Sequence, residues 1–446
     1  MTRRWWYRRW LLIFLGLDIF LIFFICWNAL DESIPNRILM FKNETQMLEF
    51  DFPMEAKLYM PAANISKTPV KSKKIHYRQE GCYRVSLSLF GWLHFKDVTL
   101  QIAKRKKVIP GGELMGVRIE TNGVFVLGTE AVMGADGVQY EPAFQVVQTG
   151  DYICKINGQN VETAEDIQKC MQQKMSDTRK DIILEIQRNK ETQTIRLTPV
   201  KDSKGGYKMG IWVRDDIQGI GTLTFFDAER RFAALGHGIA DSDTGLLLNC
   251  KKGEVFRANV LSITKGQTGE PGGIIGCIRK KATNKWGEIN ANTEKGIHGR
   301  LSPKGYRELL DTTEKLGYQT NNKEKGTGQS DSEGNAKGLE MLEVASKQEV
   351  KTGPAIIRSQ LGDTVKEYDI FIEKIRYNTE NKTKGIVLQV TDRELLEKAG
   401  GIVQGMSGSP ILQNGKIVGA VTHVFVNDAT RGYGIFAEEM EWNNEG

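Results

Sequence analysis

One serine near the C-terminal end of the chain has neighbours that suit a catalytic nucleophile. Ser407 lies in the hexapeptide GMSGSP at residues 405–410. A nucleophilic serine must project its Oγ from a tight turn, where small neighbours leave backbone N–H groups free to bind a substrate oxyanion. The alternative is an ordinary loop that enters a β-hairpin, because the Gln-Asn-Gly turn at residues 413–415 separates two apolar runs. The hexapeptide alone leaves both interpretations open.

Serine catalysis also needs a base, and the chain has five histidines from which to choose it. His237 is flanked by Gly236 and Gly238 at the end of an apolar stretch, so its imidazole is open to a cleft. His423 lies on the strand after the serine loop, where it is either a core residue or a neighbour of the site. A lone histidine is more often structural than catalytic. The pairing of His237 with the glycine-flanked Ser407 favours His237 as the base.

The residue that orients the base is less well defined by the sequence. Asp392 ends an apolar strand at 386–391 and precedes a short helix at 393–399, which leads to the serine loop. The other role open to Asp392 is to cap that helix. Composition also allows Asp241, Asp243, Asp363, Asp369 and Asp428.

The elements that must position these residues are mainly β-strands. A chain of 446 residues predicts two to three domains. Its 47 glycines punctuate short apolar runs, which favours turns and strands over long helices. The net charge of +6 is small, and the lysines are spread along the chain rather than gathered in a basic arm. Nucleic-acid binding therefore has little support.

The six cysteines do not indicate a metal site or a disulfide framework. They include no CxxC pair and no cluster of cysteine and histidine with zinc-binding spacing. Most of them are expected to be small core residues. We predict no metal and no cofactor.

The N-terminus carries a predicted membrane anchor over residues 1–30. Residues 10–29 form an apolar run interrupted by Asp18 and Asn28, about the length that crosses a ~30 Å hydrocarbon core. Four arginines precede the run and two acidic residues follow it, so the N-terminus is expected in the cytoplasm and the bulk of the chain outside. The run exceeds a typical signal-peptide core and lacks an A-x-A-like site, which favours an uncleaved signal anchor.

The next stretch is expected to separate the anchor from folded domains. Residues 31–82 are polar and proline-containing, as in a linker. Alternating apolar residues in 83–106 predict a small β segment. Residues 319–338 are rich in glycine and charge and predict a mobile surface insertion.

The most specific part of residues 107–200 is GDYICKINGQNV at 150–161, followed by a helix that starts at a capping box. The order of elements in this region resembles a PDZ domain of the bacterial type found beside exported proteases. The resemblance implies that Leu114, Met115, Gly116 and Val117 form the loop that receives a peptide carboxylate, while the peptide adds as a β-strand. The alternative is a unit that docks internally and binds no free peptide.

Residues 201–446 contain frequent short strands, which predict a barrel or sandwich. Within this region GHG at 236–238, VTD at 390–392, GIVQGMSGSP at 401–410 and AVTHVFVND at 420–428 resemble the stage IV sporulation protein B peptidases. The resemblance implies a chymotrypsin-like double β-barrel with Ser407 as nucleophile, His237 as base and Asp392 orienting it. It also implies oxyanion N–H groups at Gly405 and Ser407.

The resemblance further implies a sporulation signalling protease secreted into the forespore intermembrane space. There it would cleave itself and a membrane-bound regulator, so that an intramembrane protease activates a late sigma factor. The chief alternative is a non-catalytic PDZ scaffold that binds membrane-protein tails. The predicted partners are thus a protein substrate at the membrane, a peptide at the PDZ domain, and the bilayer around the N-terminal helix.

Overall fold

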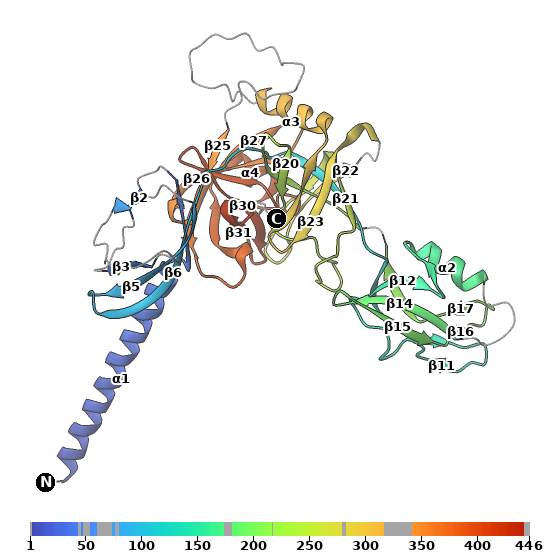
Figure 1. The fold of residues 1–446 in the computed structure, drawn as a ribbon, viewed down its shortest axis with the longest axis horizontal. Coiled ribbons are helices and arrows are strands. Elements are labelled where there is room, and N and C mark those ends of the chain that lie inside the picture. Colours follow the sequence, from blue (N-terminus) through green and yellow to red (C-terminus); the bar gives the residue numbers. More distant parts are fainter. Residues whose placement is uncertain are drawn as a thin grey trace.

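The computed structural model shows a mainly β protein with one long helix at its N-terminus (Figure 1). It describes the following residues: 2–42, 80–173, 181–215, 217–278, 282–315 and 341–440, with short strands at 46–47, 54–59 and 74–75. The segment 319–338, expected to be a mobile insertion, lies outside the described residues.

Helix α1 (Thr2–Ser33) projects away from the rest of the chain (Figure 1). Its part Trp5–Ser33 is long and apolar enough to cross a membrane, and its best apolar window buries nothing against the protein. A helix that is apolar all round and unburied fits lipid rather than a protein core. This helix therefore fits a single-pass membrane anchor, as predicted.

A small sheet follows the anchor, with the strand order β1-β6-β5-β3. Its strands are β1 (Arg37–Phe41), β3 (Met54–Tyr59), β5 (Gly81–Leu89) and β6 (Leu93–Ala103). Strands β1 and β3 fall in the stretch that we expected to be a linker. That stretch contributes instead to a folded sheet, because β1 buries its apolar residues from Ile38 to Phe41.

The PDZ-like unit is built on the strand order β15-β14-β12-β9-β18, with β13 paired to β12. The turn at Asn157-Gly158 has positive φ at both residues, and the capping box of helix α2 (Ala164–Gln173) pairs Thr163 with Asp166. Both features were predicted from the sequence. The strands are β9 (Val124–Thr129), β12 (Tyr152–Ile156), β13 (Gln159–Asn160), β14 (Ile182–Arg188), β15 (Glu191–Leu197) and β18 (Ile211–Arg214).

The segment Leu114–Val117 is a barrel strand rather than the predicted carboxylate-binding loop. It begins β8 (Leu114–Glu120), which pairs with β19 (Ile217–Phe226) on one side and β21 (Lys252–Thr264) on the other. Its side chains are buried. A strand paired on both sides has no open edge for a peptide, so this site prediction is corrected.

Two closed barrels account for most of the remaining chain. The first follows β20-β24-β23-β21-β8-β19 and closes through a β19–β20 pairing, and the second follows β30-β29-β26-β27-β28-β31 and closes through β30–β31. Strands β7 and β25 join the two barrels between β19 and β30. The chymotrypsin-like double barrel expected from the sequence is present. The PDZ-like unit is an insertion between β8 and β19 of the first barrel.

These strands have the following bounds. In and beside the first barrel they are β7 (Lys107–Pro110), β20 (Arg231–Ala234), β23 (Lys285–Thr293) and β24 (Gly296–Leu301), with helix α3 (Pro303–Lys315) after them. In and beside the second they are β25 (Leu342–Val344), β26 (Gly353–Gln360), β27 (Val365–Ile375), β28 (Ile386–Val390), β29 (Pro410–Gln413), β30 (Lys416–Phe425) and β31 (Asp428–Phe436), with helix α4 (Arg393–Ala399) after β28.

Candidate active site

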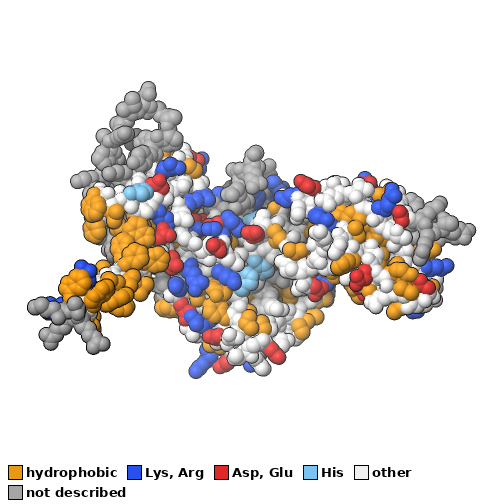
Figure 2. Space-filling model, turned by 90° about the horizontal axis from the view of Figure 1, so that it is seen from below, with side chains coloured by type: hydrophobic (Ala, Val, Ile, Leu, Met, Phe, Trp, Pro, Cys, Tyr) orange, Lys and Arg blue, Asp and Glu red, His pale blue; other side chains and the backbone are white. Residues whose placement is uncertain are grey.

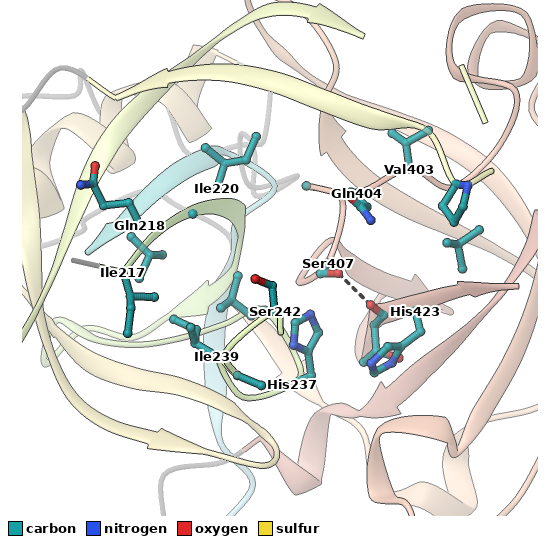
Figure 3. Close-up of a pocket in the computed structure, with 18 of the residues that line it drawn as sticks. Ile217, Gln218, Ile220, His237, Ile239, Ser242, Val403, Gln404, Ser407 and His423 are labelled. Carbon is teal, nitrogen blue, oxygen red and sulfur yellow. Dashed lines mark hydrogen bonds between the residues drawn. The ribbon is translucent and has the colours of Figure 1, made fainter. Parts of the chain in front are cut away.

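A cavity of about 620 Å³ lies between residues of the two barrels and contains both His237 and Ser407 (Figure 3). The first barrel contributes His237 from the loop after β20, and the second contributes Ser407 from the loop between α4 and β29. The residues are 170 positions apart in the sequence, and the fold brings them to one cavity. Its other lining residues include Arg214, Ile220, Asp241, Gln404, Gly405, Thr422 and His423.

The backbone around His237 is held in an unusual conformation, and glycines flank the histidine on both sides. Leu235 and Gly236 both have φ of 70°. A Cβ on Gly236 would lie 2.9 Å from Cγ2 of Thr422, and one on Gly238 would lie 2.5 Å from the carbonyl oxygen of Thr293. The two glycines therefore let the histidine loop approach strands of both barrels closely.

The imidazole of His237 is oriented by backbone rather than by a carboxylate. Its Nδ1 lies 2.9 Å from the carbonyl oxygen of Gly238. With Nδ1–H donating to that oxygen, Nε2 keeps its lone pair. Burial lowers the pKa of His237, while the hydrogen bond to Gly238 raises it by less. A neutral imidazole with a free Nε2 is the form that accepts a proton from a serine.

The serine loop is fixed by hydrogen bonds from the first barrel. Thr222 on β19 donates its N–H to the carbonyl oxygen of Ser407 at 2.9 Å and its Oγ1–H to that of Gly405 at 2.8 Å. Gly408 has φ of 97°, and a Cβ there would lie 2.1 Å from the carbonyl oxygen of Thr222. The conformation of the serine loop therefore depends on contact between the barrels.

The Ser407 hydroxyl does not hydrogen-bond to His237 in this structure. Its Oγ donates to the carbonyl oxygen of Thr422 at 2.7 Å (Figure 3). A turn about the Cα–Cβ bond of Ser407 would release the hydroxyl toward the cavity. In this structure Ser407 and His237 therefore share a cavity while each bonds to a backbone carbonyl.

Two backbone N–H groups at the serine are suited to an oxyanion. Gly405 lines the cavity with φ of 99°, a conformation that favours glycine. Within the described part of the chain, the N–H groups of Gly405 and Ser407 have no hydrogen-bond acceptor, whereas Met406 donates to Val403 and Gly408 to Val421. Paired free N–H groups beside a nucleophile are the arrangement that stabilises a tetrahedral intermediate.

Asp392 does not belong to the cavity. Its carboxylate accepts the N–H of Leu395 at 2.8 Å and caps α4, and the N–H of Asp369 lies 3.4 Å from its other oxygen. The helix-capping alternative considered from the sequence is therefore the role that the structure displays. Among the aspartates considered, Asp241 is the one that lines the cavity within the described residues.

Both oxygens of the Asp241 carboxylate already accept hydrogen bonds. One oxygen accepts from the N–H groups of Asp243 and Thr244 and from the Thr244 hydroxyl, and the other accepts from Arg214. Burial alone would raise the pKa of Asp241, but these hydrogen bonds and the Arg214 charge together lower it. Asp241 organises the loop that follows His237 and does not bond to the imidazole.

The chain matches the family model "SpoIVB peptidase S55" over residues 205–441. It belongs to this family. The match covers more than half of the chain and includes both His237 and Ser407, so it supports a serine peptidase. No curated protein matches the chain.

Solved structures with some similarity fall into two groups. A PDZ domain of an SdrC-like protein from Listeria monocytogenes is 20% identical, with a TM-score of 0.17, and the match covers 21% of this chain and 90% of that one. The HtrA-type protease AlgW with a decapeptide is 11% identical, with a TM-score of 0.27, and the match covers 51% of this chain and 52% of that one. The chain thus spans about half the length of the AlgW structure.

Sequence reasoning missed two groups at the site. Thr422 supplies the carbonyl that holds the Ser407 hydroxyl, and Arg214 reaches the cavity from β18 of the PDZ-like unit. His423 lies beside them, with its ring 5.0 Å from that of His237. Desolvation, followed by His237 and Lys384, lowers the pKa of His423 to about 4. The sequence did place His423 on the strand after the serine loop, and that position was the signal that the neighbouring Thr422 also lies near Ser407.

Proposed function

We propose that this chain is a membrane-anchored serine endopeptidase in which Ser407 is the nucleophile and His237 the general base. The observation that carries the proposal is their shared cavity, lined also by Gly405. A neutral histidine, a serine on a tight glycine turn and two free N–H groups are the parts that acyl transfer requires.

The proposed reaction begins when the Ser407 hydroxyl leaves Thr422 and turns to Nε2 of His237. Nε2 accepts the hydroxyl proton as Oγ bonds to the substrate carbonyl carbon, and the N–H groups of Gly405 and Ser407 hold the oxyanion. His237 then protonates the leaving amine, the peptide C–N bond breaks, and water releases the acyl group by the reverse sequence. Among the described residues, the other histidine that lines the cavity is His423.

We propose that Asp392 supports this site through α4 rather than through the imidazole. Its carboxylate caps the helix, which ends at Ala399 with Gly400 as its C-cap and is followed in the chain by the nucleophile loop. A helix cap is worth about 1 kcal/mol, enough to shift the populations of a loop that follows the helix. Asp392 would then be a positioning residue, while the family resemblance assigns it the orientation of His237.

The proposed biological role follows the family name. The chain would act in sporulation signalling from the forespore membrane, with its bulk in the intermembrane space. It would cleave itself between the anchor and the barrels and cleave a membrane-bound regulator of an intramembrane protease that activates a late sigma factor. The PDZ-like unit would bind a peptide or C-terminal tail at an open edge of its sheet.

Labelling with a fluorophosphonate tests the catalytic proposal. The reagent should modify wild type and Ser409→Ala but not Ser407→Ala, and His237→Ala should label much more slowly. Ser409 is the matched control because it is a buried neighbour whose Oγ has no partner among the described residues. Equal labelling of wild type and Ser407→Ala would contradict the proposal.

Self-processing separates the peptidase from the non-catalytic PDZ scaffold. In a host that lacks other proteases, Ser407→Ala should abolish cleavage in 31–82 and leave peptide binding unchanged. Continued cleavage of this variant, or absence of labelling in a folded wild-type protein that binds peptides, would favour the scaffold.

A further inference from the structure

The hairpin between β5 and β6 exposes two aromatic side chains at its tip. Phe90 is 65% exposed and Trp92 is 78% exposed, the latter the highest value among the large apolar side chains that the structure describes as exposed. Phe90 has φ of 53° and Gly91 of 80°, so a tight turn presents both rings outward. Exposed aromatic rings at one turn mark a surface that another phase or molecule covers.

The hairpin arms near the tip carry no charge. Between Arg84 and Lys96 the sequence has no Asp, Glu, Lys or Arg, and His94 is the only titratable group. An uncharged turn with Phe and Trp is the composition that enters the interfacial layer of a bilayer, where aromatic rings are favoured. A protein-binding surface would more often carry charges at its rim.

The strand directions place this tip on the membrane side of the sheet. Strand β1 leads away from the end of α1 and runs parallel to β6, with Arg37 level with Thr99. Strand β6 begins at Leu93, which is about 20 Å back from Thr99 toward α1 at ~3.3 Å per residue. The tip precedes Leu93 and therefore lies alongside the last turns of α1.

Side-chain contacts fix the sheet to α1 at this level. The rings of Trp27 on α1 and Phe95 on β6 are 4.7 Å apart, and Lys96 forms an ion pair with Asp31 at 2.7 Å. Asn378 of the second-barrel region donates to the carbonyl oxygens of Asp31 and Ile34 at 2.8 and 2.7 Å. Viewed from below, hydrophobic side chains gather at the end of the molecule that carries α1 (Figure 2).

The length of α1 sets the depth of the contact. The apolar stretch Trp5–Ser33 has 29 residues and is about 44 Å long at 1.5 Å per residue, longer than a ~30 Å hydrocarbon core. The arginines before Trp10 hold the other end at the cytoplasmic interface. The outer end, with Trp27, therefore lies at the outer interface together with the hairpin tip.

We propose that the tip Phe90–Trp92 is a second membrane contact, inserted into the interfacial layer of the bilayer that α1 spans. It would hold the barrels at a fixed height and tilt above the membrane. The proposal rests on the anchor and not on peptidase activity, so it stands or falls independently of Ser407.

The test places a photo-crosslinking phenylalanine analogue at Trp92 in the full chain, reconstituted in phosphatidylcholine vesicles. The control carries the same analogue at Trp212, which is 57% exposed on β18 of the PDZ-like unit. Lipid adducts should exceed those at position 212 by on the order of tenfold, since burial of one large apolar side chain is worth about that factor. Equal yields, or no adduct at 92 while the analogue at Phe20 of α1 reacts, would overturn the proposal.

A second measurement uses the native side chain. Vesicles of brominated lipid quench tryptophan fluorescence, and Trp92→Ser should lose a quenchable component that Trp212→Ser retains. Trp92 is exposed, so its replacement leaves the core intact. An identical quenched fraction in both variants would place Trp92 outside the bilayer.

Discussion

The two loops that meet in the cavity are supported from different parts of the molecule. The serine loop is held by the barrels themselves, through Thr222 of β19. The loop after His237 instead packs on the PDZ-like unit, where Leu248 is buried with Phe125 and Tyr152. The His237 loop is therefore coupled to the inserted unit, while the Ser407 loop is coupled to the barrel interface.

Polar contacts reinforce this difference. Arg214 of the PDZ-like unit pairs with Asp241 and Asp243, and the Tyr152 hydroxyl accepts the N–H of Asn249 at 2.9 Å. Changes in the serine loop should therefore destabilise the barrels, whereas the histidine loop should respond to changes in the PDZ-like unit.

The largest effect is expected from Gly408→Ala in the serine loop. The new Cβ would meet the Thr222 carbonyl at 2.1 Å with φ of 97°, so the free energy of unfolding should fall by about 2–5 kcal/mol. Gly415→Ala is the control, because its φ is 72° but its Cβ would meet nothing within 4 Å. It should lose only about 1–2 kcal/mol. Urea unfolding measures both, and equal losses would show that the barrel contact does not fix the loop.

The pH dependence of labelling tests what orients His237. Burial lowers the pKa of His237 below its ordinary value of 6.5, and its partner is a neutral carbonyl. The rate of fluorophosphonate labelling should therefore hold as the pH falls through 6.5 and decline only below it. A decline centred at pH 7 or above would reveal a carboxylate that orients the imidazole during reaction.

The same group affects stability with a defined sign. Because the folded-state pKa is lowered, the unfolded chain takes up the proton first. The contribution of neutral His237 to the free energy of unfolding is complete above about pH 6.5. This contribution is lost as the pH falls through the folded-state pKa of His237. His237→Gln should remove this part of the pH dependence of unfolding.

A smaller effect is expected from Arg214→Gln at the histidine loop. Loss of the ion pair leaves the buried Asp241 carboxylate without its cation, so labelling should slow by about tenfold, or ~1.4 kcal/mol. Lys208→Gln removes another ion pair of the PDZ-like unit, with Asp202, and should have little effect because the Lys208 side chain is largely exposed and neither residue lines the cavity. Similar rates for the two variants would show that the PDZ-like unit does not act on the base.

The sequence allowed the anchor, the β architecture and the His237–Ser407 pairing to be predicted, because each has a local signal: an apolar run, alternation, or glycine flanks. The boundary of the PDZ-like unit could not be predicted in this way. Leu114–Val117 has the same apolar-Gly-apolar pattern whether it is a binding loop or a barrel strand. Its partners, β19 and β21, lie about 100 or more residues further along, and local pattern does not identify partners at that distance.

Local sequence also could not decide the role of Asp392. Its replacement in Asp392→Asn gives the smallest expected effect. Asn caps helices about as well as Asp, so the variant should keep its stability and label within a few-fold of the wild-type rate. Asp392→Ala should lose about 1 kcal/mol of stability through the cap of α4. If Asp392→Asn were labelled as slowly as Asp392→Ala while remaining folded, labelling would need the charge of the Asp392 carboxylate. The Asp392 carboxylate would then have to leave the N-terminus of α4 to orient His237, so residues on both sides of the cavity would have to move.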